Sequence, residues 1–310
     1  MSDSSEERSA LPSVAFIGLG NMGAPMSVRL VRAGYAVTGF DLSEDARATL
    51  AAAGARTAET AADAVRGAGV VVLMLPSSAV VEAVLSDPAV SEALIEGSTV
   101  VDMSSSDPMS TRRLATVLET RGVTLVDAPV SGGVKGAENG KLTIMVGGAE
   151  DDVERVSPLL TTMGTARRAG PVGAGHALKA INNLLSATHL LVTAEGVLAG
   201  ERFGLDPAIM VELINTSSGR SGSTDNKFPN FVLPGTYDSG FGMKLMVKDM
   251  RIALDLAHEL GIASPLAQSA VTVWERALKE LPDTADHTEI ARWTFQATAE
   301  GTADRELVTG

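Results

Sequence analysis

A lysine and an asparagine interrupt a long apolar stretch, "GAGHALKAINNLL" at residues 173–185. Lys179 and Asn183 are four residues apart, so on a helix they share one face. Burying an ammonium and an amide costs free energy unless a polar partner meets them. Desolvation lowers the pKa of a lysine, which can then exchange protons near neutral pH. The alternative is a lysine whose stem lies on apolar surface while its ammonium reaches water.

A glycine-rich turn offers a second set of groups for a small ligand. In "DAPVSGGVKGAENGKL" (127–142), Ser131 is followed by Gly132 and Gly133. Consecutive backbone N–H groups and a hydroxyl form a concave donor set that suits a carboxylate. The turn follows a predicted strand, and open α/β sheets bind ligands beyond the carboxyl ends of their strands. A simple connecting turn is the alternative interpretation.

A glycine fingerprint near the N-terminus predicts a dinucleotide site. Gly18, Gly20 and Gly23 form a GxGxxG between a strand-like and a helix-like run, and Asp41 ends the next predicted strand. The glycines let the backbone approach a pyrophosphate, and an acidic residue about 20 positions on binds the ribose. A carboxylate repels a 2′-phosphate, and the nearest arginine is Arg47, so NAD is favoured while NADP is not excluded. The predicted cofactor-binding residues of this region are Gly18, Leu19, Gly20, Asn21, Met22, Gly23 and Asp41.

Apolar runs that alternate with helical patterns position these groups. The runs are nearly continuous, as expected where both faces of a parallel sheet are covered. The predicted strands are 13–20, 36–41, 70–76, 98–104, 124–130 and 141–148. Repeated strand–helix–strand alternation predicts a Rossmann-type α/β domain with a parallel-rich sheet.

The second half of the chain predicts an all-α domain. It begins with a helical run at 176–204, followed by helical patterns at 207–216, 243–261 and 264–280. Residues 217–242 are rich in Gly, Ser and Pro and predict a long loop, which in a compact domain is more often functional than idle. We therefore expect an α/β domain joined to an all-α domain by one long helix. The expected boundaries are a tail at 1–11, a dinucleotide-binding domain at 12–172, a helical substrate and dimerisation domain at 173–300, and a tail at 301–310.

The composition of the chain restricts the classes of partner that it can bind. The net charge is −13, which argues against nucleic acid and anionic membranes because both need a basic face. The chain has no cysteine, and its four histidines show no metal-binding spacing, so no metal is expected. The N-terminus carries no signal-peptide pattern, and the longest uncharged run, 180–194, is too short to span a bilayer. A cytoplasmic protein is expected.

The chemistry of a nicotinamide enzyme needs a group that takes or gives the hydroxyl proton. Neither Tyr35 nor Tyr237 has a lysine four residues on, which excludes a Tyr-x-x-x-Lys pair. His176 and His189 remain candidates, but neither has an acidic residue at helical spacing to orient it. Lys179 is the preferred acid or base.

Four ordered blocks together resemble the β-hydroxyacid dehydrogenase family, the group that contains 3-hydroxyisobutyrate dehydrogenase. They are "GLGNMGAPM" (18–26), "DAPVSGGVKGAENGKL" (127–142), "GAGHALKAINN" (173–183) and "GFGMKLMVKDM" (240–250). The resemblance covers about residues 12–280. It implies a Rossmann-type domain, an all-helical domain and a homodimer or homotetramer formed through the helical domain.

The resemblance also implies roles for individual residues. Lys179 would be the general acid/base, and Ser131, Gly132 and Asn183 would bind the substrate's carboxylate and hydroxyl. Lys248 would approach cofactor and substrate; its alternative interpretation is a solvated lysine paired with Asp249. Further cofactor or site contacts are implied for Leu75, Pro76, Ser105 and Phe241.

We therefore expect an NAD-dependent oxidoreductase that interconverts a small 3-hydroxy acid and its semialdehyde or 3-oxo form. Position 105 is Ser where the family more often has Thr, and the loop 221–240 departs from the 3-hydroxyisobutyrate enzymes, so the identity of the acid stays open. An aldonate dehydrogenase such as one for threonate is an alternative, as is a semialdehyde reductase of the same family. Less favoured are a 6-phosphogluconate dehydrogenase, an imine reductase and a non-catalytic NAD-binding regulator.

Overall fold

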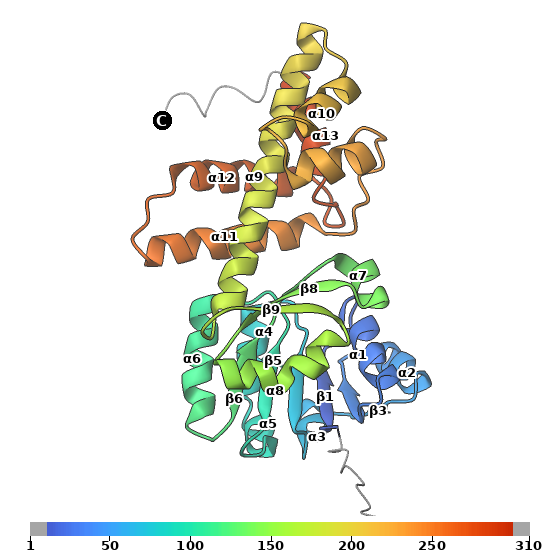
Figure 1. Ribbon diagram of the computed structural model, residues 1–310, viewed down its shortest axis with the longest axis vertical. Helices are drawn as coiled ribbons and strands as arrows, with labels where there is room; N and C mark the ends of the chain where they lie inside the picture. The colour runs from blue at the N-terminus through green and yellow to red at the C-terminus, as the bar shows by residue number, and fades with distance from the viewer. Residues whose placement is uncertain (1–10, 300–310) are drawn as a thin grey trace, which may run out of the picture. The chain divides into compact units, whose positions relative to one another are not determined.

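The computed structural model describes residues 11–299 and contains a parallel sheet flanked by helices, followed by a helical region (Figure 1). The predicted tails at 1–11 and 301–310 lie outside the described residues except for Leu11. The parallel strands run in the order β3-β2-β1-β4-β5-β6. They are β1 (Val14–Ile17), β2 (Val37–Phe40), β3 (Arg56–Thr57), β4 (Val70–Leu73), β5 (Thr99–Asp102) and β6 (Thr124–Asp127).

Three further strands extend this sheet beyond β6. They are β7 (Val130–Ser131), β8 (Leu142–Gly147) and β9 (Gly164–Gly170). β8 is antiparallel to β6 and to β7, and β9 is parallel to β8. The sequence did not indicate β9, because its residues "GTARRAG" include no large apolar side chain. The Rossmann-type fold with a parallel-rich sheet is confirmed.

Helices cover both faces of the sheet, because alternate residues of each strand point to opposite sides. On β1, Val14 and Phe16 pack into one core cluster, and Ala15 and Ile17 pack into another. The flanking helices are α1 (Gly23–Arg32), α2 (Glu44–Ala52), α3 (Ala61–Val65), α4 (Ser78–Ser86), α5 (Pro88–Ala93), α6 (Pro108–Glu119), α7 (Gly133–Asn139) and α8 (Glu150–Thr161). The central strands β1, β4 and β5 are buried at every position, as their unbroken apolar character indicated.

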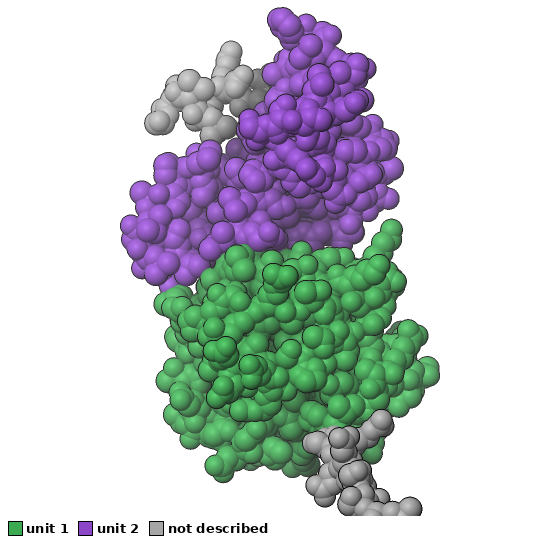
Figure 2. Space-filling view, viewed as in Figure 1, with its two compact units in different colours: residues 1–179 green, residues 180–310 purple. Residues whose placement is uncertain are grey.

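A 30-residue helix, α9 (Ala174–Phe203), opens the helical region. The chain divides into two compact units between Lys179 and Ala180, so α9 belongs to both (Figure 2). The other helices of the second unit are α10 (Pro207–Asn215), the π-helix η1 (Ser223–Val232), α11 (Met243–Glu259), α12 (Pro265–Glu280) and α13 (Glu289–Ala299). Their core is centred on large buried side chains such as Trp274, Phe228 and Met250.

The helix η1 corrects the prediction of a long loop at 217–242. Ten residues of that segment form a π-helix, although it contains Ser223 and Pro229. The helix is anchored because Phe228 and Val232 are buried in the core of the second unit. π-Helical segments are rare and are found frequently at functional sites.

Near its N-terminal end, α9 buries a polar pair and exposes apolar side chains. Lys179 and Asn183 are only 6% and 5% exposed, whereas Leu178 and Leu185 are 44% and 53% exposed. Ile181 lies on the same exposed face, three residues from Leu178 and four from Leu185. The polar pair is therefore shielded from water and the apolar stripe is not.

Within residues 11–299, no helix is long and apolar enough to cross a membrane.

Candidate active site

Each glycine of the fingerprint turn has its own steric reason. Gly18 has φ +95°, and a Cβ there would lie 2.3 Å from the carbonyl oxygen of Met74. A Cβ on Gly23 would lie 1.9 Å from the carbonyl oxygen of Gly18, so only glycine lets α1 begin this close to β1. A Cβ on Gly20 would meet nothing within 4 Å. The turn is thus closed on its inner side and open at Gly20, which fits a backbone that a pyrophosphate approaches.

Asp41 lies at the carboxyl end of β2 and is hydrogen-bonded to the same turn. Its Oδ2 accepts from the backbone N–H of Leu19 at 2.7 Å, and its Oδ1 accepts from the N–H of Ser43 at 2.9 Å. Each carboxylate oxygen keeps a lone pair for a ribose hydroxyl. The side chain of Leu19 is buried in the core, so this residue can contribute only its backbone to a cofactor site. Arg47 donates to the Asp41 carbonyl and pairs with Glu59.

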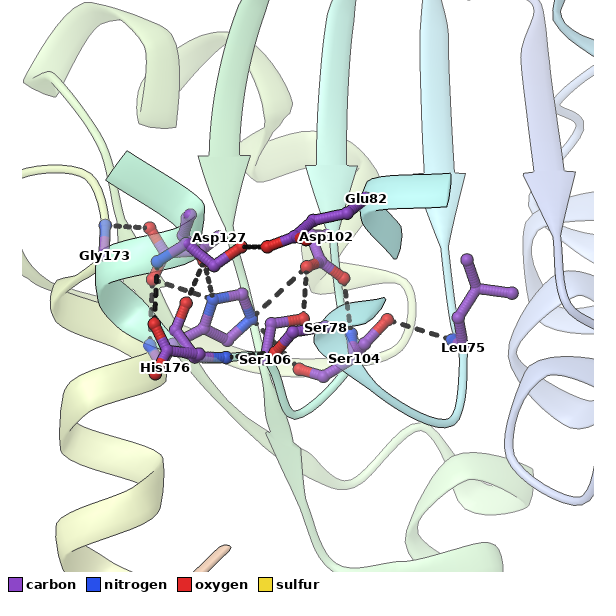
Figure 3. Close-up of polar contacts among 12 residues, drawn as sticks. Leu75, Ser78, Glu82, Asp102, Ser104, Ser106, Asp127, Gly173 and His176 are labelled. Carbon is purple, nitrogen blue, oxygen red and sulfur yellow. Dashed lines mark hydrogen bonds and ion pairs between the residues drawn. The ribbon is translucent and has the colours of Figure 1, made fainter. Parts of the chain in front are cut away.

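The carboxyl ends of the neighbouring strands form the other side of this edge. Leu75 and Pro76 follow β4, and Ser105 follows β5; all three are at least partly exposed. The backbone N–H of Leu75 donates to Ser104 Oγ at 2.9 Å, which joins the two loops (Figure 3). The strand order reverses direction between β1 and β4, and such switch points are where open α/β sheets bind ligands. The structure therefore brings the predicted cofactor residues of the first unit to one edge.

A buried polar network lies beside this edge at the start of α9 (Figure 3). Asp127, at the end of β6, accepts from the backbone N–H of Gly173 at 2.6 Å and of His176 at 2.8 Å. Asp102, at the end of β5, accepts from the N–H of Ser104 at 3.0 Å and from Ser106 Oγ at 2.7 Å. The first turn of α9 is thus held by a strand carboxylate through its otherwise unpaired N–H groups.

The imidazole of His176 lies between the two carboxylates. Its Nε2 is 3.1 Å from the carbonyl oxygen of Ser104, and its Nδ1 is 2.8 Å from Thr111 Oγ1. Because a carbonyl oxygen can only accept, Nε2 carries a proton. The carboxylates of Asp102 and Asp127 are 3.7 and 3.9 Å from the ring nitrogens. Fully buried and bonded on both nitrogens, His176 acts as a structural residue, and its acidic neighbours come from strands rather than from helical spacing.

The Ser131 turn leads from β7 into α7. Gly132 has φ +128° and Gly133 has φ +62°, both in the region that favours glycine. Both glycines are exposed, and Ser131 is partly exposed, so the backbone N–H groups of the turn are open to a ligand. The predicted donor set is present as a glycine-dependent turn.

In the second unit, Asn183 is fixed by an acidic residue of α11. Asn183 Nδ2 donates to Asp249 Oδ2 at 2.6 Å, and Asn182 Nδ2 donates to Asn183 Oδ1 at 3.1 Å. Lys248 Nζ lies 3.0 Å from Asp249 Oδ1, and Asp249 is buried. The pairing of Lys248 with Asp249, set out above as an alternative, is therefore present. Asp249 orients Asn183, a role that sequence reasoning missed because the two lie 66 residues apart.

Phe241 precedes α11 in a loop that Asp286 holds closed. Asp286 accepts from the backbone N–H of Gly240 at 2.8 Å and of Phe241 at 3.1 Å. The Phe241 ring packs edge-on against the His287 ring, with centroids 5.7 Å apart. Although burial raises the pKa of Asp286, hydrogen bonds from His287 and Thr288 hold it well below its usual range.

Lys227, on η1, is a second residue that sequence reasoning missed. Its Nζ donates to Ser186 Oγ on α9 at 2.7 Å. Burial lowers the pKa of Lys227 to about 8, against the opposing attraction of Asp286. The signal in the sequence was a lysine inside the Gly- and Ser-rich segment 217–242, but nothing local showed which element it faces.

No group of three or more His, Cys, Asp or Glu side chains is placed to hold a metal ion within residues 11–299. The donor sets found here are amide N–H groups, carboxylates, amides and ammonium groups. These groups suit a dinucleotide and a small organic acid.

Two family models together match nearly the whole described chain. The model described as the NAD binding domain of 6-phosphogluconate dehydrogenase matches residues 13–176. The model described as NAD-binding of NADP-dependent 3-hydroxyisobutyrate dehydrogenase matches residues 173–294.

Named relatives agree with these models. The chain is 39% identical over 264 residues to 2-(hydroxymethyl)glutarate dehydrogenase of Eubacterium barkeri, covering 84% of this chain and 88% of the relative. It is 38% identical over 278 residues to NAD-dependent L-serine dehydrogenase of Pseudomonas aeruginosa, covering 87% and 93%. A solved structure of Mycobacterium tuberculosis 3-hydroxyisobutyrate dehydrogenase with L-serine superposes with a TM-score of 0.87 at 32% identity, covering 92% of this chain and 99% of that one. The chain belongs to the β-hydroxyacid dehydrogenase family and is an NAD(P)-binding dehydrogenase that acts on a CH–OH group.

Proposed function

We propose that the protein oxidises a small 3-hydroxy acid to its semialdehyde, and reduces the semialdehyde in reverse, with Lys179 as the general acid/base. The observation that carries this proposal is the buried pair on α9, Lys179 and Asn183, which share a face while apolar residues of the same helix are exposed. The relatives support the substrate class, since 2-(hydroxymethyl)glutarate, L-serine and 3-hydroxyisobutyrate all carry a hydroxymethyl group next to a carboxylate-bearing carbon.

Lys179 accepts the hydroxyl proton in the oxidative direction. The neutral amine takes the O–H proton at Nζ as the C–H bond gives up its hydride, and the carbinol becomes an aldehyde. When bound, the nicotinamide cofactor accepts that hydride. The ammonium of Lys179 returns the proton in the reductive direction. The oxidative step requires the neutral amine of Lys179.

The remaining site residues hold the substrate. The Ser131 hydroxyl and the N–H groups of Gly132 and Gly133 bind its carboxylate. Asn183 binds its hydroxyl without adding a charge, and the bond to Asp249 keeps the Asn183 amide in one orientation. Lys248, balanced by Asp249, adds a positive charge for an anionic substrate. Fixing the reacting carbon in this way supplies a large part of the rate.

We also propose a preference for NAD over NADP. The Asp41 carboxylate stands at the end of β2, where it binds a ribose 2′-hydroxyl and repels a 2′-phosphate. Gly18, Gly20 and Gly23 provide the backbone for the pyrophosphate, joined by Asn21 and Met22 of the same turn. Further cofactor contacts in this proposal come from Leu75, Pro76 and Ser105 of the neighbouring loops, and from Phe241 and Lys248.

The chain forms a homodimer or homotetramer in this proposal. Leu178, Ile181, Leu185 and Val192 are exposed at positions that share one face of α9. An exposed apolar stripe of this kind is typical of a protein–protein interface. Light scattering of the protein and of Leu185→Glu tests it, with a smaller mass expected for the variant.

Initial rates with NAD and with NADP over a panel of 2-, 3- and 4-hydroxy acids, including threonate, test the activity. We expect turnover of 3-hydroxy acids and a higher kcat/KM with NAD. In Lys179→Ala, kcat falls about 10²–10⁴-fold while NAD binding, measured by calorimetry, is retained. Lys279→Ala, which removes an exposed lysine of α12, serves as the matched control.

Three results would contradict this proposal. A Lys179→Ala enzyme as active as the parent removes Lys179 from the proton transfer. Turnover of threonate alone makes the protein an aldonate dehydrogenase. Binding of NAD without turnover of any acid makes it a regulatory member of the family.

A further inference from the structure

Three polar residues lie on one face of α9. Lys179, Asn183 and Ser186 are spaced by four and then three residues, which places them in line along the helix. With a rise of about 1.5 Å per residue, Ser186 lies about 10 Å along the axis from Lys179. Lys179 and Asn183 have roles in the proposed reaction, whereas Ser186 has none.

A positive charge lies at that face, because the ammonium of Lys227 is hydrogen-bonded to Ser186. Lys227 Nζ donates to Ser186 Oγ at 2.7 Å, and Ser223 Oγ, on the same helix η1, donates to the Ser186 carbonyl at 3.4 Å. Among the residues that the structure describes, no carboxylate lies within ion-pairing distance of Lys227. An ammonium has three protons to donate. Ser186 takes one of them, so two remain for another acceptor.

The acidic residue whose charge acts on Lys227 is already committed elsewhere. Asp286 Oδ1 and Oδ2 lie 2.8 and 3.0 Å from the Ser239 hydroxyl. Asp286 also accepts from the N–H groups of Gly240 and Phe241, and from the N–H and hydroxyl of Thr288. It closes the loop at 239–241 and cannot turn toward Lys227 without giving up those bonds.

A buried polar atom near Lys227 has no partner in the part of the chain that the structure describes. His287 Nε2 is buried and has no hydrogen-bond partner among residues 11–299. Its Nδ1 lies 3.1 Å from the Phe241 carbonyl and 3.0 Å from Ser239 Oγ, so the network assigns the proton to Nδ1 and leaves Nε2 an acceptor. Burial lowers the pKa of His287, and the charge of Lys227 lowers it further. This cluster thus holds one cation with protons still to donate and one acceptor without a partner among the described residues.

We propose that Lys227 binds a second carboxylate of the substrate, at the end away from the reacting hydroxyl, so that the preferred substrates are dicarboxylic 3-hydroxy acids; this rests on the function proposed above. The spacing along α9 between Lys179 and Ser186, which Lys227 contacts, is close to the length of such a molecule. An extended chain advances about 1.2 Å per bond, so five bonds between the hydroxyl oxygen and the distal carboxyl carbon span about 6 Å. A hydrogen bond of about 2.8 Å at each end brings the reach to about 12 Å, close to the spacing of about 10 Å along α9.

A matched pair of substrates isolates the second carboxylate. 2-(Hydroxymethyl)glutarate and 2-(hydroxymethyl)pentanoate have the same carbon chain and the same reacting group, and only the first has a distal carboxylate. We expect the wild-type kcat/KM to favour the glutarate by about 100-fold. Lys227→Met lowers this ratio about 100-fold, and Lys227→Arg retains most of it. Lys279→Met, which removes an exposed lysine of the same unit, leaves the ratio unchanged.

The pH dependence of KM in the wild-type protein tests the same proposal without relying on a variant that could fail to fold. Above pH 8, the KM for 2-(hydroxymethyl)glutarate rises relative to the KM for the pentanoate by up to about tenfold per pH unit, because the neutral amine of Lys227 no longer attracts the carboxylate. Asp286 and His287, the titratable neighbours of Lys227, have lowered pKa values and keep their charge states from pH 7 to 9. Effects at Lys179 and the cofactor are common to both substrates and cancel in the ratio.

The measurements distinguish a failure of the proposed function from a failure of the role proposed for Lys227. Turnover of neither acid contradicts the proposed function itself. Turnover of both acids at similar kcat/KM leaves that function intact and overturns the role of Lys227. A strong preference for the glutarate that persists in folded Lys227→Met, or that shows no change across pH 8, places the distal carboxylate elsewhere and also overturns it.

Discussion

Two polar clusters of this protein differ in how completely their hydrogen-bonding groups are paired. In the first unit, Asp102, Asp127 and His176 bond to backbone or side-chain groups at every point where a partner is required. In the second unit, Lys227 has protons to spare and His287 Nε2 has no partner among the described residues. The first cluster joins the ends of two strands to the first turn of α9. The second cluster places the positive charge of Lys227 next to Ser186, in the middle of the same helix.

The difference separates a polar group that holds the fold from one that awaits a ligand. A satisfied buried network makes one conformation specific, and removing a member leaves its partners unpaired. A partly buried cation that has no ion pair loses hydration and lowers the stability of the folded protein, so its presence indicates a gain made elsewhere. Three changes test this contrast.

The largest effect is expected from Asp127→Ala. The change leaves the buried N–H groups of Gly173 and His176 without an acceptor, and each costs about 1–3 kcal/mol. We expect the free energy of unfolding, measured by urea titration, to fall by about 2–6 kcal/mol. Glu154→Ala, at an exposed carboxylate of the same unit, is the control and changes little. A similar small effect at both positions would show that the network does not hold the start of α9.

A smaller loss is expected from His176→Leu. The Ser104 carbonyl loses its donor, and the two carboxylates lose the polar group between them, at a cost of about 1–3 kcal/mol. The pH profile of kcat keeps its shape, because His176 is structural. His189→Leu, at an exposed histidine of α9, is the control. If the pH profile shifts while stability is unchanged, His176 takes part in the chemistry and the contrast fails.

The smallest effect is expected from Lys227→Met, and it depends on pH. Burial lowers the pKa of folded Lys227 to about 8 from 10.5, so between these values the unfolded chain binds more protons than the folded one. The stability of the wild type therefore rises relative to the variant from pH 8 upward, by at most about 1.4 kcal/mol per pH unit. At pH 7 the variant is as stable as the wild type or more so.

Urea titrations of both proteins at pH 7, 8 and 9 measure this difference, and Lys279→Met provides the pH-independent reference. A large loss of stability in Lys227→Met at pH 7 would show that the ammonium is well partnered in the folded protein. The second cluster would then follow the same rule as the first.

Local patterns account for the elements and for part of the site. The unbroken apolar runs fixed the central strands, because a strand covered on both faces needs apolar residues at every position. The GxGxxG spacing placed the cofactor turn, since sterics at Gly18 and Gly23 act over a few residues. Lys179 and Asn183 were recognisable because one helical turn joins them. The strand β9 and the helix η1 were not, as long-range pairing and packing overrode their polar and proline-containing sequences.

The sequence by itself determined the fold class, the cofactor turn and the pair on α9, because each follows from contacts between near neighbours in the chain. Only the tertiary structure decided which polar side chains form hydrogen bonds with which partners. Asp127 meets His176 across 49 positions, Asp249 meets Asn183 across 66, and Lys227 meets Ser186 across 41. Those pairings depend on how strands and helices pack, and the energy of a buried charge depends on which partners the packing brings within reach.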